Sequence, residues 1–336
     1  MGKFYKINSV KELLIALMKN KVIDAVIVPM QSLTGVTYSP FLLKEIEQIE
    51  KSEPMAPIMS INIAKTVSSL TSKGALPFKT GVVLKPCELR AFRELVKLNQ
   101  IKPENLITIS YDCSGINSLK ENETMREICE VCNFFTPEYA DIQIYSIGCD
   151  TMLVKTDSEI SSLNLEPADF VSEKRRKAVN EKYEKNLNHR ESKLLEVRGN
   201  FKQMLKNCIS CHNCMRVCPI CFCQECFFES SAVDGNSVTY TMRAGRLQGL
   251  DFPENKLLFH IGRMNHMSVS CVGCGACEDA CPADIPVSLM FATAGDSLKA
   301  LFDYEPGKDI EEKVPFTCYM HDELHDFEQP YVEKIK

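Results

Sequence analysis

Among the 336 residues of this chain, the seventeen cysteines are the side chains best suited to chemistry, and eleven of them lie from Cys208 to Cys281. Thiolates bind zinc or iron–sulfur clusters, and they form lasting disulfides in oxidising compartments. We expect no secretory signal peptide, because Lys11 and Glu12 interrupt the apolar residues near the N-terminus. The odd number of cysteines then predicts a reduced, cytoplasmic protein that uses its thiolates as metal ligands.

Two stretches share the spacing Cys-x-x-Cys-x-x-Cys-x-x-x-Cys-Pro, which is typical of bacterial ferredoxins. They are Cys208, Cys211, Cys214 and Cys218, and then Cys271, Cys274, Cys277 and Cys281. Three thiolates of one turn bind three corners of an iron–sulfur cube, and in two-cluster ferredoxins the fourth comes from the other run. We therefore expect one [4Fe–4S] cluster on Cys208, Cys211, Cys214 and Cys281, and a second on Cys271, Cys274, Cys277 and Cys218.

Zinc is the main alternative for these runs, because paired Cys-x-x-Cys units also form tetrahedral zinc sites. A zinc site needs only two such pairs, however. It requires neither the third cysteine of each Cys-x-x-Cys-x-x-Cys run nor the repeated Cys-Pro end. Three further cysteines, Cys221, Cys223 and Cys226, follow the first run directly. They form an additional site, act as alternative ligands of the first cluster, or are buried thiols, and the sequence does not decide among these.

The N-terminal cysteines are more scattered, yet two of them follow predicted strands. Cys87 and Cys113 come just after apolar segments at 80–84 and 106–109. Cofactors gather at the carboxyl ends of parallel strands. Cys129 and Cys132 add a Cys-x-x-Cys pair, so four thiolates are available for another four-iron cluster.

Alternating strand and helix signals position these cysteines. The capping box that begins at Ser9 predicts a first helix. Two further helices are predicted at 63–70 and 88–98, and strands at 24–29, 57–61, 80–84 and 106–109. Such short alternating periods predict an α/β domain with a mixed, largely parallel sheet.

The domain organisation follows from a shift in composition. Fourteen of the residues from Glu173 to Arg198 are charged, which predicts one long solvated helix. We expect an N-terminal flavin and cluster domain over 1–172 and the helical connector over 173–204. An α+β ferredoxin-like domain with two [4Fe–4S] clusters would follow over 205–295, and a tail over 296–336 packs on the body or a partner.

Composition excludes several other classes. The chain is 45% hydrophobic and 25% charged, as globular proteins are, and no apolar stretch reaches the roughly 18 residues of a spanning helix. A net charge of −6 predicts no nucleic-acid partner. No Ser–His–Asp set, Walker loop or GxGxxG fingerprint indicates a hydrolase, a kinase or a Rossmann dehydrogenase.

The N-terminal motifs resemble one known family, the beta subunits of coenzyme F420-reducing hydrogenases and F420-dependent formate dehydrogenases. The shared motifs are Pro86-Cys87 before a helix, Cys113 after a strand, Cys129-x-x-Cys132-Asn-Phe, and Ala140-Asp141-Ile142. The resemblance covers the N-terminal 200 residues or so, and the ferredoxin module follows it.

This resemblance implies a specific activity. Cys87, Cys113, Cys129 and Cys132 would bind a third [4Fe–4S] cluster beside an FAD, and the FAD would exchange hydride with coenzyme F420. The clusters would pass single electrons to a partner subunit of a formate dehydrogenase, hydrogenase or heterodisulfide reductase. The first hypothesis is thus a coenzyme F420-dependent oxidoreductase subunit whose chemistry belongs to its cofactors.

A second hypothesis is a flavin-free electron-transfer subunit that connects two partners through its clusters. Family members tend to carry paired glycines at the start of the first helix, whereas this chain reads Asn8-Ser9-Val10-Lys11. Side chains keep the backbone farther from a cofactor than glycines do, which favours this hypothesis. A zinc-stabilised interaction module is a third reading, and the repeated Cys-Pro ends disfavour it.

Overall fold

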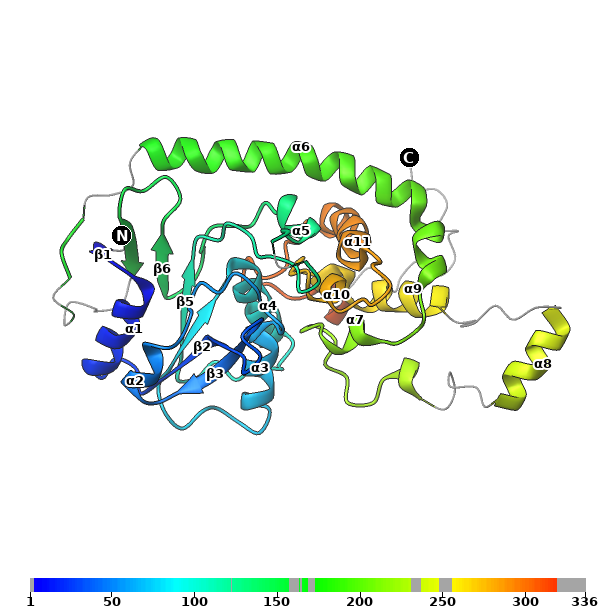
Figure 1. The fold of residues 1–336 in the computed structure, drawn as a ribbon, viewed down its shortest axis with the longest axis horizontal. Coiled ribbons are helices and arrows are strands. Elements are labelled where there is room, and N and C mark those ends of the chain that lie inside the picture. The colour runs from blue at the N-terminus through cyan, green and yellow to red at the C-terminus, as the bar shows by residue number, and fades with distance from the viewer. Residues whose placement is uncertain are drawn as a thin grey trace.

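A sheet domain and a helical region lie side by side in the computed structural model, and one long helix runs along both (Figure 1). The structure describes residues 3–121, 123–156, 163, 165–168, 173–230, 237–247 and 256–318. The predicted strand at 57–61 is the only predicted strand that is wrong: Met59 makes a single bridge to Tyr38, and its neighbours form no ladder.

The sheet has seven strands in the order β1-β7-β6-β5-β4-β2-β3. Its strands are β1 (Lys3–Ile7), β2 (Ala25–Gln31), β3 (Tyr38–Leu43), β4 (Thr80–Leu84), β5 (Leu106–Tyr111), β6 (Ile142–Tyr145) and β7 (Met152–Thr156). The neighbours β2, β4, β5 and β6 pair in parallel, while β3 and β7 pair antiparallel to their neighbours. Because β1 is antiparallel to β7, it points the same way as β6, and the mixed, largely parallel sheet is confirmed.

Short helices connect these strands and form most of the C-terminal region. They are α1 (Val10–Lys19), α2 (Ile46–Ile49), α3 (Ile63–Thr71), α4 (Pro86–Lys97), α5 (Glu127–Glu130), α7 (Asn213–Arg216), α8 (Ser237–Leu247), α9 (Lys256–Met267), α10 (Ala276–Asp279) and α11 (Val287–Phe302). The predicted N-cap is present, since the Ser9 hydroxyl accepts a hydrogen bond from the Glu12 backbone N–H. The reciprocal half of the predicted capping box is replaced, because the Glu12 carboxylate accepts from the Asn8 side-chain amide. None of the helices in the described ranges has the length and apolar character needed to cross a bilayer.

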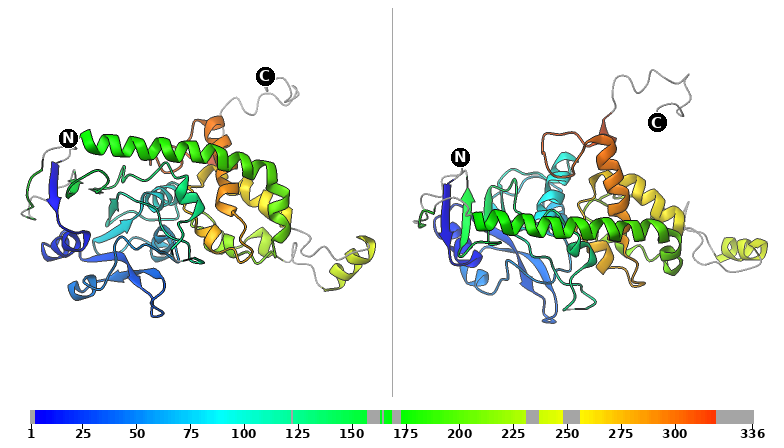
Figure 2. Two further views of the ribbon diagram at one scale, coloured as in Figure 1. Left: turned by 45° about the horizontal axis from the view of Figure 1, so that its top comes forward. Right: turned by 90° about the horizontal axis from the view of Figure 1, so that it is seen from above.

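The charged helix predicted from composition is α6 (Glu173–Met204), and Figure 2 shows it lying along the sheet domain and the helical region alike. Two of its arginines anchor it at separate points. The Arg175 guanidinium donates to both carboxylate oxygens of Asp112, which follows β5. Arg190 donates to both oxygens of Asp296 on α11, over 2.9 and 2.8 Å. The helix therefore connects the two parts by buried or half-buried ion pairs.

The main hydrophobic core is shared by the two parts of the molecule. It contains Val67 of α3 and Leu95 of α4 together with Met290 and Phe291 of α11. A second core lies between α1 and the sheet, and it includes Leu14 of α1, Val28 of β2 and Ile109 of β5. Because the first core is continuous, the sheet domain and the helical region hold each other in place.

Candidate iron–sulfur centres

The first predicted ligand set surrounds one cavity. Its walls include all four predicted sulfur ligands, Cys208, Cys211, Cys214 and Cys281. The chain turns tightly here because Ser210 and His212 have positive φ values of 50° and 59°. This turn directs the Ser210 amide to the Cys208 sulfur, 3.4 Å away. Backbone N–H groups directed at thiolates are a means of tuning such clusters.

The second predicted set surrounds a separate cavity, lined by Cys218, Cys271, Cys274 and Cys277. Gly273 and Gly275 make the turn between these cysteines with φ values of 66° and 77°. In both cavities the fourth cysteine comes from the other run, as the ferredoxin spacing predicts. The structure thus gathers both sets, and their ligand role stays a prediction.

The third set comes from three elements at the carboxyl edge of the sheet. Cys87 lies in the first turn of α4, Cys113 follows β5, and Cys129 and Cys132 lie in and after α5. Burial raises the pKa of Cys129 to about 12, and the nearby thiolate of Cys132 adds to it. Burial likewise raises the pKa of Cys113, and Cys132 raises it further. Cys113, Cys129 and Cys132 therefore lie within electrostatic reach of one another.

The third set adjoins the second. Burial and the Glu88 carboxylate raise the pKa of Cys87, and Cys274 and Cys113 also contribute. Cys132 and Cys271 line one further cavity between the two sets. Arg263 relates the second set to the first, because it lines the second cavity and its Nη1 is 3.1 Å from the Cys214 sulfur. The second set therefore adjoins both others.

The chemistry of these cysteines fits iron–sulfur clusters. Burial raises the pKa of Cys214 and of Cys271 to about 11, so neither is a thiolate near neutral pH without a compensating charge. Bound iron supplies that charge, and binding releases the thiol protons.

The joint between the second set and the sheet domain rests on a buried arginine that sequence reasoning missed. Arg126 donates to the Asp279 carboxylate over 2.5 Å, to the Cys274 carbonyl over 3.0 Å and to the Met59 carbonyl over 2.8 Å. Next to it, a Cβ on Gly275 would lie 2.7 Å from a methyl carbon of Ile128. The only sequence signal for this joint was the glycine in the cysteine turn.

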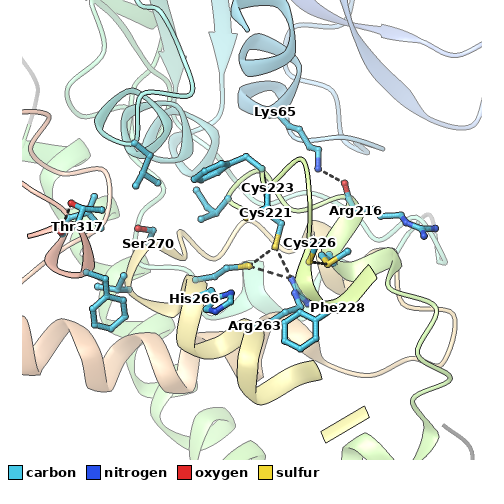
Figure 3. Close-up of a pocket in the computed structure, with 18 of the residues that line it drawn as sticks. Lys65, Arg216, Cys221, Cys223, Cys226, Phe228, Arg263, His266, Ser270 and Thr317 are labelled. Atoms are coloured by element: carbon cyan, nitrogen blue, oxygen red, sulfur yellow. Dashed lines mark hydrogen bonds between the residues drawn. The ribbon is translucent and has the colours of Figure 1, made fainter. Parts of the chain in front are cut away.

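The three additional cysteines line a larger cavity of about 460 Å³ beside the second set (Figure 3). The Cys221 sulfur lies 2.7 Å from the Met267 sulfur, and the Cys226 sulfur 3.6 Å from that of Met215. Cys223 is exposed. Cys223 and Cys226 therefore lie outside the three sets, whereas Cys221 hydrogen-bonds with Cys218 of the second set, and this bond raises the pKa of Cys218.

A flavin is not favoured by the start of α1, at the same edge of the sheet. The Ser9 hydroxyl already accepts a hydrogen bond from the backbone N–H of Glu12, and the side-chain amide of Asn8 donates to the Glu12 carboxylate. A pyrophosphate would meet this carboxylate rather than free backbone donors. The described residues of this helix start therefore do not fit the flavin.

Fold and site together define an iron–sulfur protein with an α/β domain in front of a ferredoxin-type module. Residues 203–285 match the 4Fe-4S dicluster domain family, which supports 4Fe-4S clusters in this part of the chain and implies electron transfer.

About 70% of the chain is similar to beta subunits of F420-dependent formate dehydrogenases, as the motifs predict. One relative, F420-dependent formate dehydrogenase subunit beta of Methanocaldococcus jannaschii, is 27% identical over 74% of this chain and 79% of its own. F420-dependent formate dehydrogenase 1 subunit beta of Methanococcus maripaludis is 26% identical over 69% and 74%. A chain of the F420-reducing [NiFe] hydrogenase complex from Methanosarcina barkeri covers 58% of this chain and 91% of its own, with 16% identity and a TM-score of 0.45.

Proposed function

We propose that this protein is the electron-transferring iron–sulfur subunit of a cytoplasmic redox complex and that it carries three [4Fe–4S] clusters. The observation that supports the proposal is the arrangement of the cysteines: two sets of four each surround a cavity, Arg263 reaches both, and Cys132 of the third predicted set lines a cavity together with Cys271. Adjacent clusters allow single electrons to pass from the sheet domain to the far end of the ferredoxin module. The chain's own residues position the clusters and exclude water from them.

The relatives indicate the kind of complex. Their names place them in F420-dependent formate dehydrogenases. We infer that a flavin elsewhere in the complex takes a hydride from reduced coenzyme F420 and passes its two electrons one at a time to the first or last cluster of this chain. The other end delivers them to a partner subunit of the formate dehydrogenase, hydrogenase or heterodisulfide reductase type.

The number and position of the clusters can be tested on the full chain, purified and reconstituted without oxygen. We expect about twelve iron atoms per chain. The variant Cys129→Ser with Cys132→Ser should lose about four of them while retaining the electron paramagnetic resonance signals of the ferredoxin clusters.

Cys223→Ser is the matched control, because Cys223 lies outside the three sets and should leave the iron content unchanged. Iron near eight in the unmodified protein would remove the third cluster. Full iron in the double variant would show that Cys129 and Cys132 are structural thiols.

A second candidate function is hydride transfer between coenzyme F420 and an FAD held by this chain elsewhere than at the start of α1, and the words F420-dependent in the names of the two relatives favour the first partner of this reaction. The pure protein would then retain FAD and reduce an artificial one-electron acceptor with reduced coenzyme F420. Protein that contains its clusters yet retains no flavin after incubation with FAD would leave electron transfer as the function of this chain.

A further inference from the structure

Arg263 on α9 is a buried cation that lies between the first two cysteine sets. It is 2% exposed. One of its terminal nitrogens, Nη1, is 3.1 Å from the Cys214 sulfur, and Nη2 donates to the Cys214 carbonyl over 3.2 Å. The same side chain lines the cavity of the second set. Figure 3 shows it beside Cys221, whose sulfur is 3.9 Å from Nη2.

Arg263 differs from the other buried arginines in its partners. Arg90, Arg126 and Arg175 each form an ion pair with a carboxylate. Arg263 has no carboxylate partner among the residues that the structure describes, and its guanidinium lies over the rings of Phe259 and Phe291 instead. A buried charge without a counter-charge strongly destabilises a protein. Something anionic must therefore compensate this guanidinium.

The neighbouring thiolates identify that anion. Nη1 is directed at the Cys214 sulfur, and the same side chain lines the cavity that Cys218, Cys271, Cys274 and Cys277 surround. Cys214 belongs to the first set, and Cys218 and Cys277 belong to the second. A four-iron cluster with four thiolate ligands is an anion, so two anions would flank one guanidinium.

We propose that Arg263 is a shared positioning residue for the two ferredoxin clusters, which raises the reduction potential of both by hydrogen bonding and charge. The inference rests on the proposed function, because it requires both clusters. Each cluster accepts one electron on reduction, with no bond formed or broken, and becomes more negative. A nearby positive charge and an N–H donor directed at a ligand sulfur favour the more negative state.

The test compares Arg263→Gln and Arg263→Lys with the unmodified holoprotein in redox titrations followed by electron paramagnetic resonance. Arg263→Gln removes the charge and should lower the midpoint potentials of both ferredoxin clusters, leaving that of the N-terminal cluster unchanged. Arg263→Lys retains the charge and should shift both potentials less. Arg216→Gln is the control, because Arg216 lies on the neighbouring α7 but is exposed and paired with Glu229, and it should shift neither potential.

Unchanged potentials in iron-replete Arg263→Gln would overturn the proposal, as would a shift in one cluster alone. If Arg263→Gln loses its iron, the result for Arg263→Lys decides between the two roles. An Arg263→Lys variant with full iron and potentials close to those of the unmodified protein supports the electrostatic role. Iron loss in both variants shows that Arg263 has a packing role and overturns the proposal. Failure of the proposed function looks different, because the unmodified protein would then lack the two ferredoxin signals.

Discussion

Arg126 links the sheet domain to the ferredoxin module through one guanidinium. Its carboxylate partner, Asp279, is buried, and its other hydrogen bonds go to carbonyls of Cys274 and Met59. An exposed pair of the same charge type, Lys120 and Asp284, joins the same two parts nearby, with 2.5 Å between nitrogen and oxygen. The two pairs allow burial to be compared at similar geometry.

We expect Arg126→Gln to destabilise the protein by about 3–5 kcal/mol, because it leaves the Asp279 carboxylate buried without a counter-charge. Lys120→Gln, the matched control, should cost at most about 1 kcal/mol. Thermal unfolding of the anaerobic holoproteins measures both. Equal melting temperatures for the two variants would contradict this account of the joint.

Tight turns of positive φ position the cysteines, and Gly275 at the start of α10 is the most constrained of them. Its φ is 77°, and Ile128 of α5 occupies the space where a Cβ would be. Gly199 in α6 offers a contrast, because nothing lies within 4 Å of its Cβ position. The same substitution therefore has opposite expected effects in the two helices.

Gly275→Ala should destabilise the holoprotein by about 2–4 kcal/mol, from backbone strain and from the clash with Ile128. It should also reduce the iron retained by the second and third sets, which meet at this contact. Gly199→Ala should instead stabilise the protein by about 0.5–1 kcal/mol, because alanine favours the helix. Melting temperature and iron content together check both, and a neutral Gly275→Ala would contradict the close contact.

One continuous core and one long helix unite the two parts of the molecule. The core runs from α3 and α4 into α11, and α6 is anchored to Asp112 at one end and to Asp296 further along. Unfolding of either part exposes apolar surface of the other. The parts are therefore expected to unfold together.

Removal of iron by an anaerobic chelator should lower the melting temperature of the whole molecule, because ligands that bind only the folded state stabilise it. A single transition should be seen before and after, by circular dichroism and by calorimetry. A sheet domain that melts at an unchanged temperature after iron removal would show that the two parts are independent.

The sequence by itself predicted the local patterns. Strands at 80–84 and 106–109 and the helix from Ser9 were predictable because hydrophobic periodicity and capping act within a few residues. The interchange of Cys218 and Cys281 between the two runs was also predictable, since the Cys-Pro spacing keeps the fourth thiol away from its own turn. By contrast, β1, β3, β6 and β7 escaped prediction, and the segment at 57–61 was wrongly predicted as a strand, because strand pairing depends on partners far away in the sequence.

Only the tertiary structure decided which distant residues meet. It brought Cys87 next to Cys274, paired Arg126 with Asp279, and placed Arg263 between two cysteine sets without a carboxylate. No periodicity marks an arginine as buried, because its burial depends on charges and rings supplied by elements far away in the sequence. Cysteine spacing reflects a local turn and can therefore be recognised in the sequence. The charged side chains around each predicted cluster come together only when the whole core has packed.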